Sequence, residues 1–466
     1  MFFKKFIGDR AFYRKVLAVS IPIMVQSGIT NFVSLLDNIM VGRLGTEPMS
    51  GVSIVNQFIF VFNLLIFGAI SAAGIFTAQY HGLGDRDGER YTFRFKLLIN
   101  AVASLLAIVI FFCFDDALIS LFLHEESSEG NLALTLAYAK QYLMIMLIGL
   151  VPYAISQVYA STMRETEQTL PPMVASVVAV AVNFFLNWIL IFGLFGLPAL
   201  GVRGAAIATV ISRFAELTVL VIWGHTHTQK CPYLVGAFRS FRIPRRLFSQ
   251  IAVKGLPLMA NELFWALAMT LRNQCYSTRG LEVVAAQNIN STIINLFNVI
   301  YMAIGSAIAI IVGNLLGAAK FEEARDADRK MMAFSVTCAV GLGALLISFS
   351  HLFPLLYNTT EHVRSLASYM MTVSAIAMPF YAFAHSAYFT LRSGGKVLIT
   401  LLFDSVFMWG IVLPISFVLA YFTNVNIFWL FALAQGTEII KVIFGAILLR
   451  RGTWLRQLVS DESLKQ

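Results

Sequence analysis

The chain has 466 residues, of which 58% are hydrophobic and 13% are charged, and its mean hydropathy is +0.76. A soluble globular protein carries about a quarter charged residues, so this composition excludes that class. The formal net charge of +9 does not indicate a nucleic-acid partner, because the basic residues lie in short loops between long apolar runs. We therefore expect an integral membrane protein whose main surroundings are the lipid bilayer.

Apolar runs follow one another along the whole chain, and each approaches or exceeds the ~20 residues that a helix needs to cross the hydrocarbon core. Because the bilayer core holds no water, the backbone groups of each run must pair within the run, which predicts helices. The twelve expected spans are residues 16–40, 51–80, 97–114, 136–160, 171–195, 204–224, 251–275, 283–313, 331–350, 366–390, 397–420 and 427–449.

The first and seventh spans also begin an internal repeat, whose constant offset is the one that aligns Pro22 with Pro257. The same offset aligns Met24 with Met259, Gly45 with Gly280, Glu47 with Glu282, Ile54 with Ile289, Phe62 with Phe297, Asn63 with Asn298, and Gly82 with Gly317. An apolar chain with two homologous halves is typical of a transporter whose pathway runs between them.

The repeat predicts the architecture, because six spans per half is an even number and the halves then share one orientation. We expect an all-α integral membrane protein of twelve transmembrane helices in two six-helix lobes, related by a pseudo-twofold axis along the membrane normal. The N-lobe would comprise residues 1–224, a cytoplasmic linker residues 225–248, and the C-lobe residues 249–466.

Basic residues cluster in alternate loops, which sets the expected orientation. They gather in both termini, in the loop after the second span (Arg86, Arg90, Arg94, Lys96), in the linker and in the loop after the eighth span (Lys320, Arg325, Arg329, Lys330). We therefore place both termini in the cytoplasm and expect a plasma membrane or bacterial inner membrane location.

Four polar residues fall at one depth in the outer half of the first lobe. Asp37 lies in the first span, Asn183 and Asn187 lie on one face of the fifth, and Thr209 lies in the sixth. One carboxylate with neutral oxygens suits a hard cation or a proton. A polar network that only ties the helices together is the alternative.

The second lobe carries fewer such signals. Glu262, five residues after Pro257, is a candidate proton or cation carrier, with a residue that faces a water-filled cavity as the alternative. Asp404 lies nearer the cytoplasmic end of its span, which favours a solvated carboxylate. Arg213 with Glu216, and Glu438 with Lys441, are opposite charges three residues apart, which predicts local ion pairs.

No enzymatic constellation is recognisable in the spans. Gly82 to Asp85 resembles the glycine-aspartate signature of intramembrane aspartyl proteases, but that chemistry needs a second aspartate in a facing helix. Cysteine and histidine spacings fit no metal site, and a P-loop lysine motif is lacking. We expect no enzyme, no catalytic residues, no metal and no cofactor.

Taken together, these residues resemble the multidrug and toxic compound extrusion (MATE) family over nearly the whole chain. Residues 36–45 and 201–209 carry the most specific resemblance, and residues 78–82 with their repeat partner 313–317 add to it. The resemblance implies a secondary antiporter that exports organic cations in exchange for H⁺ or Na⁺, and we expect a monomer.

The family's first-lobe cation site maps onto Asp37, Asn183, Asn187 and Thr209. One branch of the family has aspartate where this chain has Asn187, which leaves the choice of ion open. A second-lobe site of another branch pairs a helix 7 glutamate, matched by Glu262, with a helix 10 aspartate, and this chain has Tyr381 at that position.

Four side chains at related positions of the fourth and tenth spans, Tyr153, Gln157, Tyr381 and His385, are candidates for lining a substrate cavity, because aromatic faces suit organic cations. The repeat offset also aligns Asp37 with Arg272. Arg272 is therefore a candidate gate residue or charge partner of Asp37, with an arginine that reaches the outer headgroups as the alternative.

Two rival functions stay open beside the antiporter. A lipid-linked oligosaccharide flippase of the same broad superfamily would need a strongly cationic central cavity, whereas few basic residues lie in the middle of the expected spans. An intramembrane enzyme would need a paired acid and base or a metal constellation.

Overall fold

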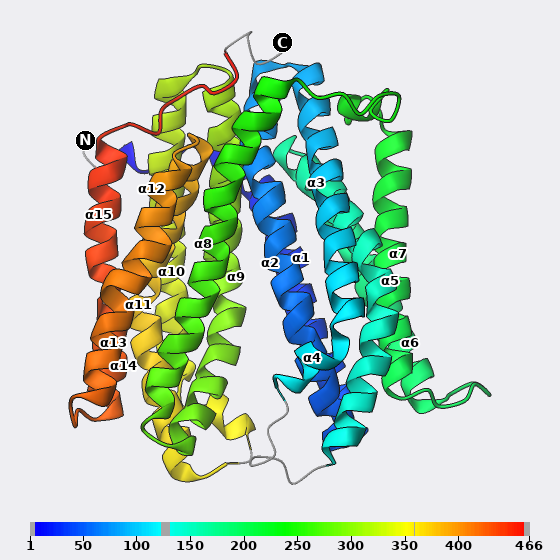
Figure 1. The fold of residues 1–466 in the computed structure, drawn as a ribbon. Helices are drawn as coiled ribbons and strands as arrows, with labels where there is room; N and C mark the ends of the chain where they lie inside the picture. The colour runs from blue at the N-terminus through cyan, green and yellow to red at the C-terminus, as the bar shows by residue number, and fades with distance from the viewer. Residues whose placement is uncertain (1–4, 123–130, 358, 461–466) are drawn as a thin grey trace. The chain divides into compact units, whose positions relative to one another are not determined.

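The computed structural model describes residues 5–122, 131–357 and 359–460, and every regular element within these residues is helical. The elements, shown in Figure 1, are α1 (Arg10–Gly42), α2 (Thr46–Leu83), α3 (Arg86–Cys113), α4 (Asp115–Ser120), α5 (Leu132–Glu165), α6 (Leu170–Phe192), α7 (Val202–Thr226), η3 (Pro232–Leu234), α8 (Arg245–Ser277), α9 (Leu281–Gly317), α10 (Phe321–Phe349), η4 (Phe353–Leu356), α11 (Glu361–Ser393), α12 (Val397–Leu401), η5 (Leu402–Val406), η6 (Met408–Val412), α13 (Leu413–Tyr421), α14 (Ile427–Gly436) and α15 (Glu438–Arg450).

The expected helical membrane fold is confirmed, because the described residues include twelve helical segments long and apolar enough to cross a membrane. Two of the twelve are composite. The eleventh, Val397–Tyr421, runs from α12 through two π-helical stretches to α13, and the twelfth, Ile427–Arg450, joins α14 to α15. π-Helical turns are frequent at functional sites.

Several helices extend well beyond the apolar run that predicts them. Helix α3 begins at Arg86, well before the expected span, because the side chain of Asp85 caps it by accepting from the backbone nitrogen of Gly88 at 3.1 Å. The residues Arg94 and Lys96, which we assigned to a cytoplasmic loop, therefore lie in α3 and are buried. Hydropathy identifies the apolar part of a helix and does not detect polar turns at its start.

The chain divides into two compact units. The N-terminal unit comprises Val25–Thr77 and Asp85–Ile251. The C-terminal unit comprises the described residues before Val25, the segment Ala78–Gly84, and the described chain from Ala252 onward. Helix α1 thus contributes to both units, and the division falls three residues after Pro22, which lies inside that helix.

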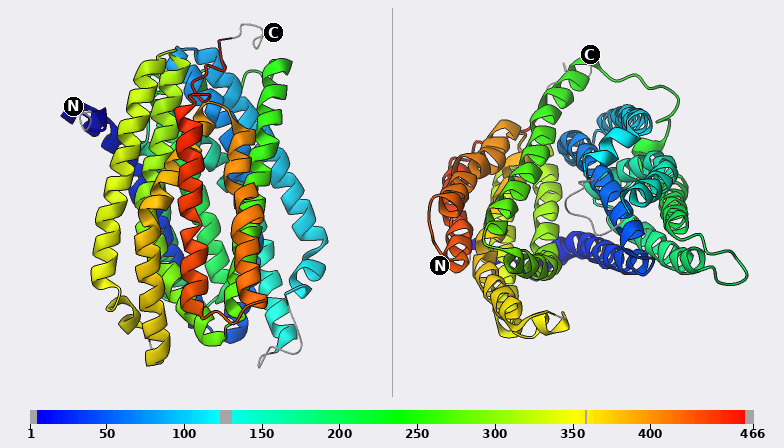
Figure 2. Two further views of the ribbon diagram at one scale, coloured as in Figure 1. Left: turned by 90° about the vertical axis from the view of Figure 1, so that its left-hand side faces the viewer. Right: turned by 60° about the horizontal axis from the view of Figure 1, so that its bottom comes forward.

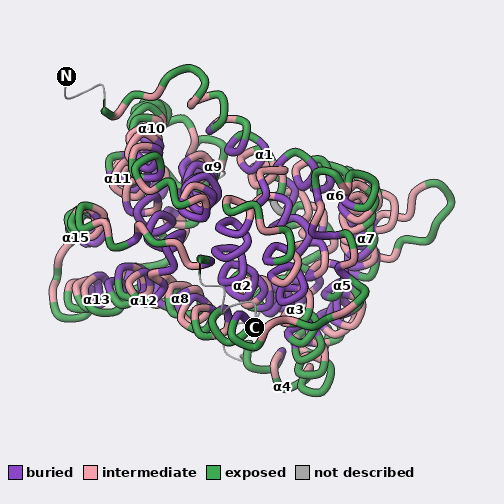
Figure 3. Tube along the Cα trace, turned by 90° about the horizontal axis from the view of Figure 1, so that it is seen from above, coloured by how far each residue is buried: buried purple, intermediate pink, exposed green. Residues whose placement is uncertain are grey.

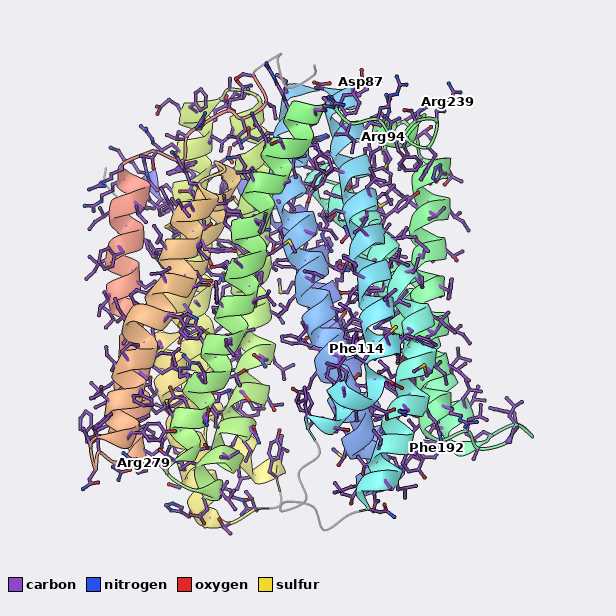
Figure 4. All side chains as sticks on the ribbon, in the orientation of Figure 1. Asp87, Arg94, Phe114, Phe192, Arg239 and Arg279 are labelled. Carbon is purple, nitrogen blue, oxygen red and sulfur yellow. The ribbon has the colours of Figure 1, made fainter. Side chains whose placement is uncertain are left out.

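The core of the N-terminal unit runs between α2, α3, α5 and α7 and continues into the segment after α7. Tyr233 and Cys231 of that segment are fully buried. Arg94 of α3 donates to the carbonyl oxygens of Ala237 at 2.8 Å and Gly236 at 2.9 Å, which fastens the segment to the helices. Figure 4 shows Asp87, Arg94 and Arg239 together at one end of this unit and Phe192 at the opposite end.

In the C-terminal unit, α9 is the most buried helix and lies against α10 and α11, as Figure 3 shows from above. Figure 2 shows α15 running alongside the other helices of the unit. The first half of α1 joins this unit because Val16, Val19 and Ile23 pack into a core with Ile304 and Ile308 of α9.

The internal repeat becomes visible where the end of α2 crosses the end of α9 within the C-terminal unit. A Cβ atom added to Gly82 would collide with the backbone of Asn314, and one added to Gly317 would collide with the backbone of Gln79. The repeat offset aligns Gln79 with Asn314, just as it aligns Gly82 with Gly317. The repeat therefore relates the contact of Gly82 with Asn314 to the contact of Gly317 with Gln79, which is the pattern of a twofold axis.

Residues near the end of the described chain form hydrogen bonds with the helix ends at this crossing. Gln79 donates to the carbonyl oxygen of Ser393 at 3.0 Å and accepts from the backbone nitrogen of Leu458 at 2.6 Å. Gln457 donates to the carbonyl oxygen of Gly317 at 2.6 Å. These bonds join the ends of α2, α9 and α11 to the residues that follow α15.

Candidate functional site

The four polar side chains predicted for the first lobe come together in the N-terminal unit. Asp37 lies five residues before the end of α1, and Asn187 lies five residues before the end of α6. Asn183 is one turn earlier on the same face of α6, and Thr209 lies in the second turn of α7. Because α1 and α6 approach the same end of the unit at which α7 begins, the three helices bring these residues to one depth.

Close packing of α6 on α7 makes this meeting possible. Gly204 of α7 lies against the backbone of α6, and a Cβ atom there would stand 2.6 Å from the carbonyl oxygen of Leu190. A side chain at this position would push the two helices apart and separate Thr209 from Asn183. The turn between the helices relies on Gly193 and Gly201, both with positive φ angles.

A continuous set of hydrogen bonds connects the four residues. Asn187 Nδ2 donates to Asp37 Oδ1 at 2.6 Å and is 3.1 Å from the amide of Asn183. With its amide nitrogen toward Asp37, Asn183 donates to Oδ1 at 2.9 Å, and its oxygen then accepts from Thr209 Oγ1 at 3.3 Å. Asp37 is the one carboxylate in this set and accepts from two amides.

This geometry suits a carboxylate that exchanges one positively charged partner for another. The amide nitrogens face Asp37, whereas a hard cation is held by oxygens. Asn187 Oδ1 is buried and has no hydrogen-bond partner among the described residues. A half-turn of the Asn187 amide about its last torsion would present that oxygen to a cation beside Asp37, at little steric cost because the two ends of an amide are nearly equal in size.

A second polar chain in the N-terminal unit was missed by sequence reasoning. Arg164 donates to Gln26 Oε1 at 3.1 Å, Gln26 donates to Ser176 Oγ at 2.8 Å, and Ser176 donates to Glu216 Oε1 at 2.8 Å. The expected ion pair of Arg213 with Glu216 is wrong. Arg213 instead donates to the carbonyl oxygen of Gly149 at 3.2 Å.

Helical spacing suggested the Arg213–Glu216 pair, but neighbouring helices supply other partners for both side chains. The guanidinium of Arg213 lies over the ring of Tyr153 at 5.0 Å. Tyr153, one of the candidate cavity residues, therefore already has a cation on one face. Gln157, one turn further along α5, is half-buried in the same unit.

In the C-terminal unit, Glu262 belongs to a larger polar network. The hydroxyl of Tyr388 donates to Glu262 Oε1 at 3.2 Å, and the amide of Asn261 donates to Asp404 Oδ2 at 3.2 Å. Lys441 Nζ forms an ion pair with Asp404 Oδ1 at 2.6 Å. The expected Glu438–Lys441 pair is therefore wrong, and Asp404, with a side chain 17% exposed, is not the solvated carboxylate that we expected.

The remaining candidates of the C-terminal unit lie among aromatic and polar groups. The hydroxyl of Tyr381 donates to Gln435 Oε1 at 2.5 Å. His385 packs between the rings of Tyr301 and Phe389, with centroid distances of 5.9 and 5.1 Å. Arg272 is 7% exposed, so its side chain is buried and does not extend along the surface of the helix bundle.

Two further buried charges lie outside the spans expected from the sequence. Lys96 pairs with Glu165 of α5, and Asp328 of α10 accepts from the hydroxyl of Thr390 of α11. A signal for Asp328 exists in the sequence, because Ala324, Asp328 and Met331 share one buried face at helical spacing.

A family model places the chain among known proteins. The MatE model matches residues 22–189 and again residues 257–421. This chain belongs to the MatE (MATE) family. The two matches begin at Pro22 and Pro257, the same pair of prolines that the internal repeat aligns.

Curated MATE relatives cover most of the chain. It is 23% identical over 460 residues to a probable multidrug resistance protein NorM of Thermotoga maritima, covering 97% of this chain and 96% of the relative. It is 26% identical over 365 residues to the multidrug resistance protein MdtK of Yersinia pseudotuberculosis, covering 78% of each.

Solved MATE structures share the fold. A multidrug resistance MATE family transporter of the MOP superfamily in an outward-facing conformation has a TM-score of 0.84 at 18% identity, covering 96% of this chain and 98% of that one. A mutant of the Vibrio cholerae MATE transporter VcmN also has a TM-score of 0.84 at 18% identity, covering 98% of this chain and 99% of that one. As a MATE transporter, this chain is a multi-pass membrane protein, is not an enzyme and is coupled to an ion gradient.

Proposed function

We propose that this MATE transporter is an antiporter that exports organic cations in exchange for H⁺ or Na⁺, with Asp37 as the residue at which the two compete. The observation that carries the proposal is the carboxylate of Asp37 within hydrogen-bonding distance of two amides, at 2.6 Å from Asn187 and 2.9 Å from Asn183. A carboxylate in a membrane helix is costly, and such groups mark ion and substrate pathways.

Competition at one carboxylate is sufficient to couple the two fluxes. A ligand moves a conformational equilibrium only by its differential affinity for the two states. If Asp37 can hold either the coupling cation or the substrate cation, each must leave before the other binds. The drug-resistance names of the NorM and MdtK relatives support an organic substrate.

Aromatic side chains supply the second element of the proposal. Within the N-terminal unit, Tyr153 offers a ring face and Gln157 an amide to a flat or alkylated cation. Within the C-terminal unit, Tyr381 and His385 offer ring faces of their own. In the N-terminal unit, Arg213 already lies over Tyr153, so a substrate cation would compete with the Arg213 guanidinium for that ring face. Binding would then displace a resident charge, as at Asp37.

A lipid-linked oligosaccharide flippase receives less support from the buried basic residues. Such a protein needs free cations to hold a pyrophosphate. Lys96 and Lys441 are instead paired with carboxylates, and Arg213 donates to a backbone carbonyl.

The proposal is tested by efflux from liposomes. Purified protein is reconstituted with ethidium inside, and a Na⁺ gradient and a proton gradient are imposed separately. We expect efflux driven by one or both gradients and collapse of that efflux when the gradient is dissipated with a matched ionophore. Efflux that persists unchanged without any ion gradient would contradict antiport.

A substitution at Asn187 tests the site itself. We expect Asn187→Asp to strengthen Na⁺ binding by roughly tenfold, because a second carboxylate raises the charge of a hard-cation site. The measurement is the Na⁺ concentration that half-saturates protection against thermal unfolding in detergent. Asn38→Asp is the matched control, because it adds the same charge to the exposed face of α1. Equal Na⁺ affinities in Asn187→Asp and wild-type protein would mean that the geometry is not that of a cation site.

A further inference from the structure

The C-terminal unit contains a buried lysine whose ammonium group is paired with a carboxylate. The ammonium group of Lys441 lies 2.6 Å from Asp404 Oδ1, and the side chain of Lys441 is 9% exposed. The other carboxylate oxygen, Oδ2, accepts from Asn261 at 3.2 Å. Asp404 thus accepts from an ammonium on one oxygen and from an amide N–H on the other, and the ammonium occupies the place that a small free cation would take beside Oδ1.

The irregular geometry of the eleventh span builds this pocket. Asp404 lies in the π-helical stretch η5, and Ser405 next to it donates to Asn261 Oδ1 at 2.7 Å, which fixes the amide. Lys441 Nζ lies 5.3 Å from the ring centre of Phe403 and 5.9 Å from that of Phe407. Aromatic faces attract cations at these distances.

Helix α15 fits against the pocket through a glycine. Gly445 lies one turn after Lys441, and a Cβ atom there would stand 3.2 Å from the ring of Phe403. A larger residue would push Phe403 aside. The ring is therefore held where it covers the ammonium, and Lys441 enters between two rings and a carboxylate.

Two further carboxylates, those of Glu438 and Glu262, lie next to residues of this pocket. Glu438, one turn before Lys441, is 3% exposed, and its Oε2 has no hydrogen-bond partner among the described residues. Glu262 accepts from Tyr388, whose hydroxyl also lies 3.4 Å from Asn261 Nδ2. The guanidinium of Arg392 lies over the ring of Tyr388, with its central carbon 5.9 Å from the ring centre.

We propose that Lys441 is a tethered cation, which fills a carboxylate and aromatic pocket of the C-terminal unit and excludes free monovalent cations and small primary ammonium ions from it. The pocket has what such ions need: the carboxylate of Asp404 and the aromatic faces of Phe403 and Phe407. Lysine supplies the same compact, strongly hydrated charge on a flexible stem. The proposal rests on contacts within this unit and does not depend on the transport cycle proposed for Asp37.

The proposal makes a chemical rescue possible. Lys441→Ala removes three methylene carbons and the ammonium nitrogen, which together correspond to n-propylammonium. The vacated space would then be lined by Asp404, Phe403 and Phe407, and it would have the size and charge of that ion. Because a buried carboxylate without its partner is strongly destabilising, binding of the ion should be visible as a gain in stability.

The test uses the full chain in detergent, with Asp37→Asn in every variant so that the N-terminal site does not contribute. Thermal unfolding is followed with n-propylammonium, Na⁺ or K⁺ as probes. Tetramethylammonium serves as an oversized cation and 1-propanol as a neutral ligand of similar shape. The variants are Asp37→Asn alone, the same with Lys441→Ala, and the same with Lys441→Ala and Asp404→Asn together.

We expect Lys441→Ala to lower the unfolding midpoint, and n-propylammonium to restore it saturably by about 3 °C or more. Asp37→Asn alone, 1-propanol and tetramethylammonium should show no such response, and Asp404→Asn should remove the rescue. If Lys441→Ala alone does not yield folded protein, purification in n-propylammonium should recover it.

Two outcomes would overturn the tethered cation. The first is a Lys441→Ala protein that gains nothing from n-propylammonium, Na⁺ or K⁺, or that cannot be recovered in them although the double variant with Asp404→Asn folds. The second is a protein with Lys441 intact that binds these ions through Asp404, because the pocket would then be open. Neither outcome bears on efflux through Asp37, which is measured separately.

Discussion

Replacing Asp37 by asparagine is expected to abolish ion-coupled efflux of a cationic dye while the protein remains folded. Asparagine has nearly the shape of aspartate and can still hydrogen-bond to Asn187 and Asn183, so the packing of α1 on α6 should be kept. It cannot carry the negative charge at which a coupling cation and a substrate cation would compete. The measurement is ethidium efflux from liposomes under an imposed gradient.

The control for this experiment is Asp87→Asn. The side chain of Asp87 is 64% exposed and pairs with Arg90 at the start of α3, so its loss removes a carboxylate from the surface. We expect wild-type efflux from Asp87→Asn and only the leak rate of protein-free liposomes from Asp37→Asn. Efflux by a folded Asp37→Asn protein at the wild-type rate would remove Asp37 from the mechanism.

The contrast between Asp37 and Asp404 shows what a sequence can predict about a buried charge. Asp37 could be matched with Asn183, Asn187 and Thr209 because each lies in a regular helix, where the number of residues from the helix end gives the depth. Asp404 lies in a π-helical stretch, in which the residues per turn differ from those of an α-helix. Its position near one end of the span predicted a solvated carboxylate, and the interior partner Lys441, which comes from another helix, was missed.

Ion pairs were the least predictable part of the structure. The pairing of Glu438 with Lys441 follows from the spacing of three residues on a helix, which is a rule for solvated helix surfaces. Inside a bundle, side chains from other helices are as close as the next turn. Lys441 therefore pairs with Asp404, 37 residues earlier in the chain. Such partners depend on tertiary packing, and no local pattern carries them.

The repeat, by contrast, aligns two glycines that turn out to lie at one helix crossing. Its offset pairs Gly82 with Gly317 in sequence, and the structure places both at the crossing of α2 and α9. Only glycine leaves room for two helix backbones to approach this closely. A glycine found at the same place in both halves of a repeat is thus a candidate for a close approach of two helix backbones.

The largest loss of stability is expected from a residue that we first assigned to a loop. Lys96 of α3 is fully buried, forms an ion pair with Glu165 of α5, and donates to Ser161 Oγ at 3.2 Å and Thr162 Oγ1 at 3.1 Å. Lys96→Met would leave the carboxylate of Glu165 without its partner. Removing one member of a buried pair costs about 3–5 kcal/mol of unfolding free energy.

The loss could come from the unpaired carboxylate of Glu165 or from the lost packing of the lysine side chain. The double variant Lys96→Met with Glu165→Gln separates these two causes, because replacing both charges leaves no unpaired ion. We expect it to recover most of the stability, measured as the midpoint of thermal unfolding in detergent. Arg90→Met serves as the surface control, since its exposed pair with Asp87 should contribute little. If the double variant is no more stable than Lys96→Met alone, the lysine stabilises α3 against α5 by its packing, and the buried ion pair is not what holds these helices together.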